Sequence, residues 1–327
     1  MATHYAASVV HWFGQKVFEQ SGFEWSLRRS GDQKLGMWRK KFKTRGGQKK
    51  IQNKRFVLTP GFGDSPLSWL MVIGMIGPAL RRAGFDEIVL LDFPGFNGRL
   101  VDEKCIPTMD LLFEAVEDLF DWLEPDTILG HSLGGWLAAR YAVDCGAGIR
   151  PKSRRRHGYE GPSQLLLVAS AGVYESIEVR DATGQIFAEL VGQGGFDALR
   201  PHLFAKEPLW FGWVAKGFSR FAADPGIRQF TQSVREDHIL QDRLSEIRAR
   251  TWLIWGDQDT LVPTGGVGTW LAGLLAPESA ARAVLLRGVG HSPQLEKPGV
   301  TAAVLSQILL GREPHQKGAR WWEVRPA

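Results

Sequence analysis

The chain has 327 residues, of which 44% are hydrophobic and 23% are charged. This balance is typical of a globular protein with a large core, and it excludes an intrinsically disordered chain. No run of roughly 18 apolar residues occurs, so the sequence predicts no membrane-spanning helix. Two cysteines, Cys105 and Cys145, do not make a disulfide framework. With no signal peptide recognised at the amino terminus, these features predict a cytoplasmic protein.

The net charge of +5 is distributed unevenly along the chain. Lysine and arginine crowd residues 28–55, and a second basic cluster runs from Arg150 to Arg156. Such clusters are usually a solvated face, but they also suit a peripheral contact with an anionic membrane. No recognised nucleic-acid module accompanies the charge, so no nucleic-acid partner is expected.

Residues 4–20 show apolar side chains at helical spacing, which predicts a helix. Phe23, Trp25 and Leu27 then alternate with polar residues, and 35–44 reads as a returning strand. We therefore expect residues 1–53 to form a basic amino-terminal extension with a helix and a strand hairpin.

From Arg55 onward, short apolar runs alternate with helical patterns, which predicts a mostly parallel sheet covered by helices on both faces. The expected strands are 56–59, 88–91, 127–130, 165–169, 251–255 and 283–286. The expected helices are 65–83, 108–123, 133–145, 264–276 and 298–310.

One interval breaks this alternation. Residues 174–248 contain no buried strand run and many aromatic residues, so we expect a helical cap there. The core then comprises 54–173 and 249–313, and 314–327 form a carboxyl-terminal tail.

The strongest chemical signal is the sequence Gly130-His131-Ser132-Leu133-Gly134. An expected strand precedes it and an expected helix of small residues follows it. A serine on such a sharp strand-to-helix turn is exposed and strained, and the flanking glycines remove side chains that would clash. Ser132 is therefore the candidate nucleophile.

Two later loops supply candidate partners for Ser132. Asp259 follows the expected strand 251–255, and His291 follows the last expected strand. The carboxyl ends of parallel strands are where active sites of such sheets collect. Asp259 is the candidate acid and His291 the candidate base, with Asp257 as the competitor for the acid.

The loop Pro60-Gly61-Phe62-Gly63 ends the first core strand. The backbone N–H groups of Phe62 and Leu133 are candidates for binding a developing oxyanion. The loop from Asp92 to Gly98 ends the next strand, and it either shapes a neighbouring wall or is an ordinary turn.

With these motifs the chain resembles the α/β-hydrolase family, and within it the cap-bearing serine esterases and lipases. The matching stretches are 61–64, 92–98, 130–135, 256–263 and 290–298. The resemblance implies an eight-stranded, mostly parallel sheet, a helical cap inserted after the sixth strand, and no metal or organic cofactor. Pro60 stands where many relatives have histidine, which bears on the orientation of the Phe62 loop.

The expected activity is hydrolysis of an apolar, lipid-like carboxylic ester through an acyl-enzyme on Ser132. The serine argues against dehalogenase and epoxide hydrolase chemistry, and it leaves thioesterase, amidase and carbon–carbon bond hydrolase activities open. Candidate substrate-binding residues are His131, Trp210, Phe211 and Trp213. The alternative is a binding module without catalysis, whose basic amino-terminal segment contacts a membrane surface or an acidic partner. The sequence does not indicate an oligomeric state.

Overall fold

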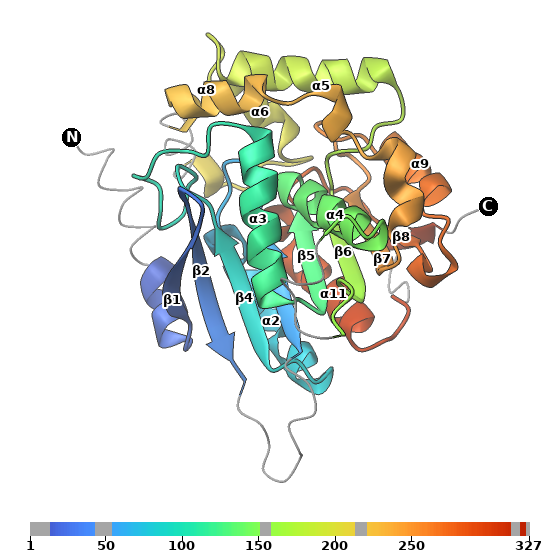
Figure 1. Ribbon diagram of the computed structural model, residues 1–327. Coiled ribbons are helices and arrows are strands. Elements are labelled where there is room, and N and C mark those ends of the chain that lie inside the picture. Colours follow the sequence, from blue (N-terminus) through green and yellow to red (C-terminus); the bar gives the residue numbers. More distant parts are fainter. Residues whose placement is uncertain (1–13, 43–53, 151–157, 213–220, 315–320, 325–327) are drawn as a thin grey trace.

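The computed structural model describes residues 14–42, 54–150, 158–212, 221–314 and 321–324. Within these residues a single sheet of nine strands forms the centre of the molecule (Figure 1), in the order β1-β2-β4-β3-β5-β6-β7-β8-β9. The strands are β1 (Glu24–Ser30), β2 (Gln33–Lys41), β3 (Arg55–Thr59), β4 (Glu87–Asp92), β5 (Thr127–His131), β6 (Gln164–Val168), β7 (Arg250–Gly256), β8 (Arg282–Leu286) and β9 (Trp321–Val324).

Neighbouring strands from β3 to β8 are parallel, whereas β1, β2 and β9 join antiparallel. The expected eight-stranded, mostly parallel sheet is present as β1 to β8, which confirms the predicted fold class. The ninth strand, β9, pairs with β8 at the edge. It lies inside residues 314–327, for which we expected only a tail.

Helices cover both faces of the sheet (Figure 1): α2 and α11 lie on one face, and α3, α4 and α9 on the other. Their bounds are α2 (Leu70–Arg82), α3 (Met109–Leu123), α4 (Leu133–Gly146), α9 (Gly265–Gly273) and α11 (Pro298–Leu309). The strands serve both layers because successive side chains point to opposite faces. In β3, Phe56 and Leu58 join the core under α2 and α11, and Val57 joins the core under α3 and α4.

Between β6 and β7 the described residues form helices and no strand, and the longer of these helices lie over one end of the sheet (Figure 1). They are α5 (Ile177–Leu190), α6 (Phe196–Leu199), η3 (Arg200–His202), α8 (Pro225–Gln232), η4 (Glu236–His238) and η5 (Gln241–Glu246). The indole of Trp136 in α4 donates to the His238 carbonyl oxygen at 2.9 Å and so ties this cap to the core. The remaining short helices are η1 (Pro66–Trp69), η6 (Pro277–Ser279) and α10 (Pro293–Glu296).

The amino-terminal part contains a helix over 14–20 and the hairpin of β1 and β2, while 1–13 and 43–53 lie outside the described residues. Several of its cations are paired within the fold. Arg39 and Arg55 both contact Glu87, at 2.8 and 3.1 Å, and Lys34 contacts Glu103 at 3.2 Å. Among the described residues no helix is long and apolar enough to cross a bilayer.

Arg150, the first residue of the second basic cluster, is paired within the fold and does not belong to a solvated face. Its guanidinium is largely buried and contacts three carboxylates of α3, at 2.8 Å (Glu117), 3.2 Å (Asp118) and 2.5 Å (Asp121). A sequence pattern of like charges cannot reveal partners about 30 residues earlier in the chain. The neighbouring cations at 151–157 lie outside the described residues.

Candidate active site

Ser132 stands at the turn between β5 and α4 with φ 52° and ψ −117°, a left-handed conformation that is costly for a residue with a side chain. The turn is tight because the chain passes close to itself. A Cβ atom on Gly130 would lie 2.4 Å from the Gly134 carbonyl oxygen, and one on Gly134 would lie 2.2 Å from that of Thr59. The two glycines are therefore required for the turn that presents Ser132.

His291 and Asp259 meet beside this turn. His291 Nδ1 lies 2.9 Å from Asp259 Oδ2, and both side chains are buried. The other carboxylate oxygen accepts hydrogen bonds from the backbone N–H groups of Leu261 and Val262, each at 2.9 Å. Because an ionised carboxylate only accepts, the imidazole carries its proton on Nδ1, which leaves Nε2 as the basic nitrogen.

Asp257, the competitor for the acid, is engaged elsewhere. Its Oδ1 accepts from the backbone N–H of Gly288 at 2.6 Å and of Val289 at 3.3 Å. The structure thus pairs His291 with Asp259 and uses Asp257 to hold the loop that leads to His291.

His131 forms a second histidine contact at the site. Its Nε2 lies 2.9 Å from the carbonyl oxygen of His291, and its Nδ1 faces Asp64 Oδ2 at 3.8 Å. Sequence reasoning missed Asp64. Its place directly after the Gly-Phe-Gly loop was a usable signal, because that loop approaches the same end of the sheet.

Phe62 and Leu133 line the same cavity as Ser132. Leu133 is the first residue of α4, and N–H groups in the first turn of a helix have no carbonyl partner within the helix. A Cβ atom on Gly61 would lie 3.3 Å from Ser132 Cβ, so the loop that contains Gly61 and Phe62 passes close to the serine side chain. The amide of Asn97 donates to the Gly63 carbonyl oxygen at 2.7 Å and fixes the far end of this loop.

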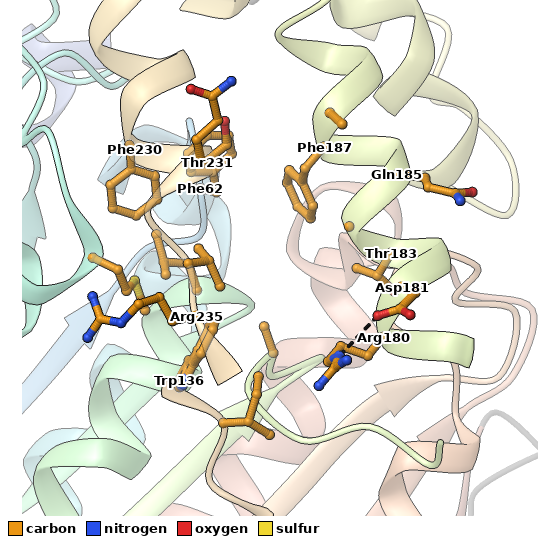
Figure 2. A pocket seen from close by; sticks show the side chains of 18 of the residues that line it. Phe62, Trp136, Arg180, Asp181, Thr183, Gln185, Phe187, Phe230, Thr231 and Arg235 are labelled. Atoms are coloured by element: carbon orange, nitrogen blue, oxygen red, sulfur yellow. Dashed lines mark hydrogen bonds and ion pairs between the residues drawn. The ribbon is translucent and has the colours of Figure 1, made fainter. Parts of the chain in front are cut away.

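A cleft of about 660 Å³ opens from Ser132 between α5 and α8. Figure 2 shows Phe187 of α5 opposite Phe62 and Phe230, with Arg180 and Arg235 on opposite walls. Arg180 contacts Asp181 and Glu236, each at 3.1 Å. Burial raises the pKa of Tyr174, in the cleft wall, to about 12, so its phenol stays neutral. The cleft is therefore apolar inside, with paired charges in its walls.

A smaller cavity of about 40 Å³ shares Phe62, Ser132 and Phe187 with the cleft and is also lined by His291. Two of the predicted substrate-binding residues, His131 and Phe211, line it as well. Trp210 lines neither cavity, and 46% of its surface is exposed. Trp213 lies outside the described residues.

The loop after β4 packs under this region. Asp92 is fully buried, and its Oδ2 accepts from the Arg99 backbone N–H at 2.6 Å. Burial raises the pKa of Asp92 from its ordinary value of 3.8 to about 7. Within the described residues, no group of three or more His, Cys, Asp and Glu side chains is arranged to hold a metal ion.

The sheet, the cap and the strained serine turn define an α/β-hydrolase architecture. Residues 56–304 match the alpha/beta hydrolase family, so the chain belongs to that family. A curated relative is monoacylglycerol lipase abhd6-A of Xenopus laevis, 25% identical over 88% of this chain and 85% of the relative.

Solved structures show the same fold. One is a bacterial membrane phospholipase A, with a TM-score of 0.63 and 22% identity over 94% of each chain. Another is carboxylesterase CesB of Bacillus subtilis, with a TM-score of 0.63 and 16% identity, covering 92% of this chain and 99% of the esterase.

Proposed function

We propose that the protein is a serine hydrolase that cleaves carboxylic esters with an apolar acyl group through an acyl-enzyme on Ser132. The observation that carries this proposal is the buried contact of 2.9 Å between His291 Nδ1 and Asp259 Oδ2, beside a serine held at φ 52°. A hydrogen-bonded His-Asp pair beside a serine that stands on a strained turn and lines a cleft is the arrangement that activates a hydroxyl for acyl transfer.

In the first half of the reaction, Ser132 Oγ attacks the ester carbonyl carbon and His291 Nε2 takes the hydroxyl proton. The carbonyl oxygen becomes an oxyanion, which the N–H groups of Phe62 and Leu133 bind. As the intermediate collapses, the bond to the alcohol oxygen breaks and His291 returns the proton to that oxygen. The alcohol leaves, and the acyl group stays on Ser132.

In the second half, water takes the place of the alcohol. His291 removes a proton from the water as its oxygen attacks the acyl carbon, and it then protonates Ser132 Oγ, so that the carboxylic acid is released. Asp259 stabilises the imidazolium formed in each half without itself taking up a proton.

The test is hydrolysis of p-nitrophenyl butyrate by the wild type and by Ser132→Ala. We expect kcat to fall by about 10⁴-fold or more in the variant. Ser170→Ala is the matched control, because Ser170 is buried close to the same turn but lines neither cavity. Its activity should match the wild type. A Ser132→Ala protein that is folded and retains wild-type turnover would refute the proposal.

The nature of the scissile bond is decided by comparing a butyryl ester, a butyryl thioester and a butyryl anilide. The curated lipase relative and the esterase neighbour favour the ester. Faster turnover of the thioester or the anilide, measured as kcat/KM, would move the assignment to a thioesterase or an amidase.

A peripheral contact of residues 28–55 with an anionic membrane is a second proposal, favoured by the lipase relative and the membrane phospholipase neighbour. Ion pairs to Glu87 and Glu103 already engage three of the described cations, which limits the charge left for lipid. Co-sedimentation with phosphatidylserine vesicles should weaken as salt rises. Binding that is insensitive to salt would contradict this electrostatic contact.

A further inference from the structure

The two cavities at the site differ in how they relate to His291. Ser132 lines both, but His291 lines only the small cavity of about 40 Å³. In the reaction proposed above, His291 protonates the departing alcohol oxygen, so the alcohol must leave on the side of His291. The acyl chain is then directed into the cleft of about 660 Å³, a volume usual for small-molecule sites.

Phe62 lines that cleft and also the small cavity, and its ring is surrounded by four phenylalanine rings. The centroid distances are 5.6 Å to Phe96, 5.5 Å to Phe187, 5.0 Å to Phe221 and 5.6 Å to Phe230. Phe187 and Phe230 belong to the cap and themselves line the cleft, as Figure 2 shows. Phe96 and Phe221 contact the ring without lining the cleft.

The backbone next to Phe62 is fixed by contacts on its carboxyl side, whereas part of the Phe62 ring faces the cleft. On its carboxyl side, Asn97 fixes the Gly63 carbonyl oxygen, and Gly63 packs closely on the Phe221 ring. Phe62 is nevertheless only half-buried, and its exposed part lines the cleft. Side chains that lack contacts on one side lose the corresponding dispersion energy, so a chain in the cleft would complete the packing of this ring.

We propose that the acyl chain of the substrate, by packing against Phe62, holds the Phe62 N–H in place to bind the oxyanion. This inference rests on the proposed function. Through Phe62, a chain bound in the cleft thus improves the binding of the oxyanion that forms from the ester carbonyl group. Binding energy from a remote part of the substrate is expressed in kcat when it positions groups that act in the transition state. A longer acyl chain therefore raises kcat as well as lowering KM.

The experiment uses methyl esters from acetate to octanoate, followed by pH-stat titration, with kcat and KM measured separately. For the wild type, we expect kcat to rise about tenfold between acetate and octanoate. In Phe187→Leu and Phe230→Leu, kcat should fall for every ester because both rings contact Phe62, and the rise from acetate to octanoate should shrink to about twofold because both rings also line the cleft. Leu209→Ala, a fully exposed change in the cap, is the control and should keep the wild-type profile.

The variant Phe221→Leu distinguishes the positioning of Phe62 from the binding of the acyl chain in the cleft. Because Phe221 contacts Phe62 but does not line the cleft, its loss should lower kcat for all chain lengths by a similar factor. Alkyl acetates of increasing alcohol length should show no rise in kcat, since the cavity lined by His291, where the alcohol leaves, is small.

A chain-length effect confined to KM, or a rise in kcat that persists in both Phe187→Leu and Phe230→Leu, would overturn the coupling and leave the proposed function intact. A wild type that neither turns over methyl acetate nor reacts with a fluorophosphonate would instead remove the proposed function, and the coupling with it. Melting temperatures of the variants confirm that they are folded.

Discussion

His131 Nε2 lies 2.9 Å from the backbone carbonyl oxygen of His291. A carbonyl oxygen only accepts, so His131 donates this hydrogen bond. The residue directly before the candidate nucleophile thus holds the backbone of the candidate base, across 159 intervening positions of the chain. The contact links the serine turn to the loop after β8 independently of the side chain of His291.

Removing this contact should reduce turnover without removing the nucleophile. In His131→Leu, the loop with His291 loses its tie, and we expect kcat for p-nitrophenyl butyrate to fall by about 10- to 100-fold, since small misplacements are costly. His131→Gln, which keeps an N–H donor, should recover part of the loss. Equal losses in the two variants would speak against this positioning role.

Substitutions of Asp259 and Asp257 should have very different effects on kcat. Asp259→Asn removes the charge that stabilises the imidazolium, so we expect kcat to fall by about 10⁴-fold. Asp257→Asn keeps an oxygen that accepts from Gly288 and should change kcat little. Steady-state kinetics on both variants provide the measurement, and a larger loss in Asp257→Asn would contradict the pairing.

The backbone strain at Ser132 predicts an unusual order of stability. Because φ is 52°, alanine at this position keeps the steric cost and glycine relieves it. Both variants are expected to be inactive, and Ser132→Gly should be more stable than Ser132→Ala by about 1 kcal/mol. Urea denaturation of the two proteins side by side measures the difference. A more stable alanine variant would mean that the turn is not strained in solution.

The buried Asp92 predicts a dependence of stability on pH. Its pKa rises from 3.8 to about 7 on folding, so the folded state keeps a proton that the unfolded state releases. The stability contribution of this group is therefore complete below about pH 4 and is lost as pH rises through about 7.

Asp92→Asn removes this titration. The free energy of unfolding of the wild type, relative to the variant, should fall by roughly 2–4 kcal/mol between pH 4 and pH 8. A constant difference across this range would show that folding does not raise the pKa of Asp92. Chemical denaturation at several pH values provides the comparison.

Local sequence was sufficient for the parts of the fold that depend on periodicity. The alternation of apolar runs after Arg55 predicted all six parallel strands, and the glycines around Ser132 predicted the serine turn. The strand at Trp321–Val324 was missed because its pairing with β8 depends on a partner distant in sequence.

The remaining features depend on which side chains the fold brings together. Asp257 and Asp259 are two residues apart in the same loop, and only hydrogen bonding to Gly288 or to His291 separates their environments. Trp210 looked like a cleft residue because aromatic composition does not reveal which side of a short segment faces inward. The packing of Phe62 depends on rings from four separate segments.

The central claim is that Ser132 carries the acyl group, and the most direct measurement is covalent labelling with a fluorophosphonate, followed by peptide mass spectrometry. We expect a single adduct, on the peptide that contains Ser132. It should be absent in Ser132→Ala and should form much more slowly in His291→Ala. Ester hydrolysis by a wild type that carries no adduct on that peptide, or equal labelling of Ser132→Ala, would contradict the central claim.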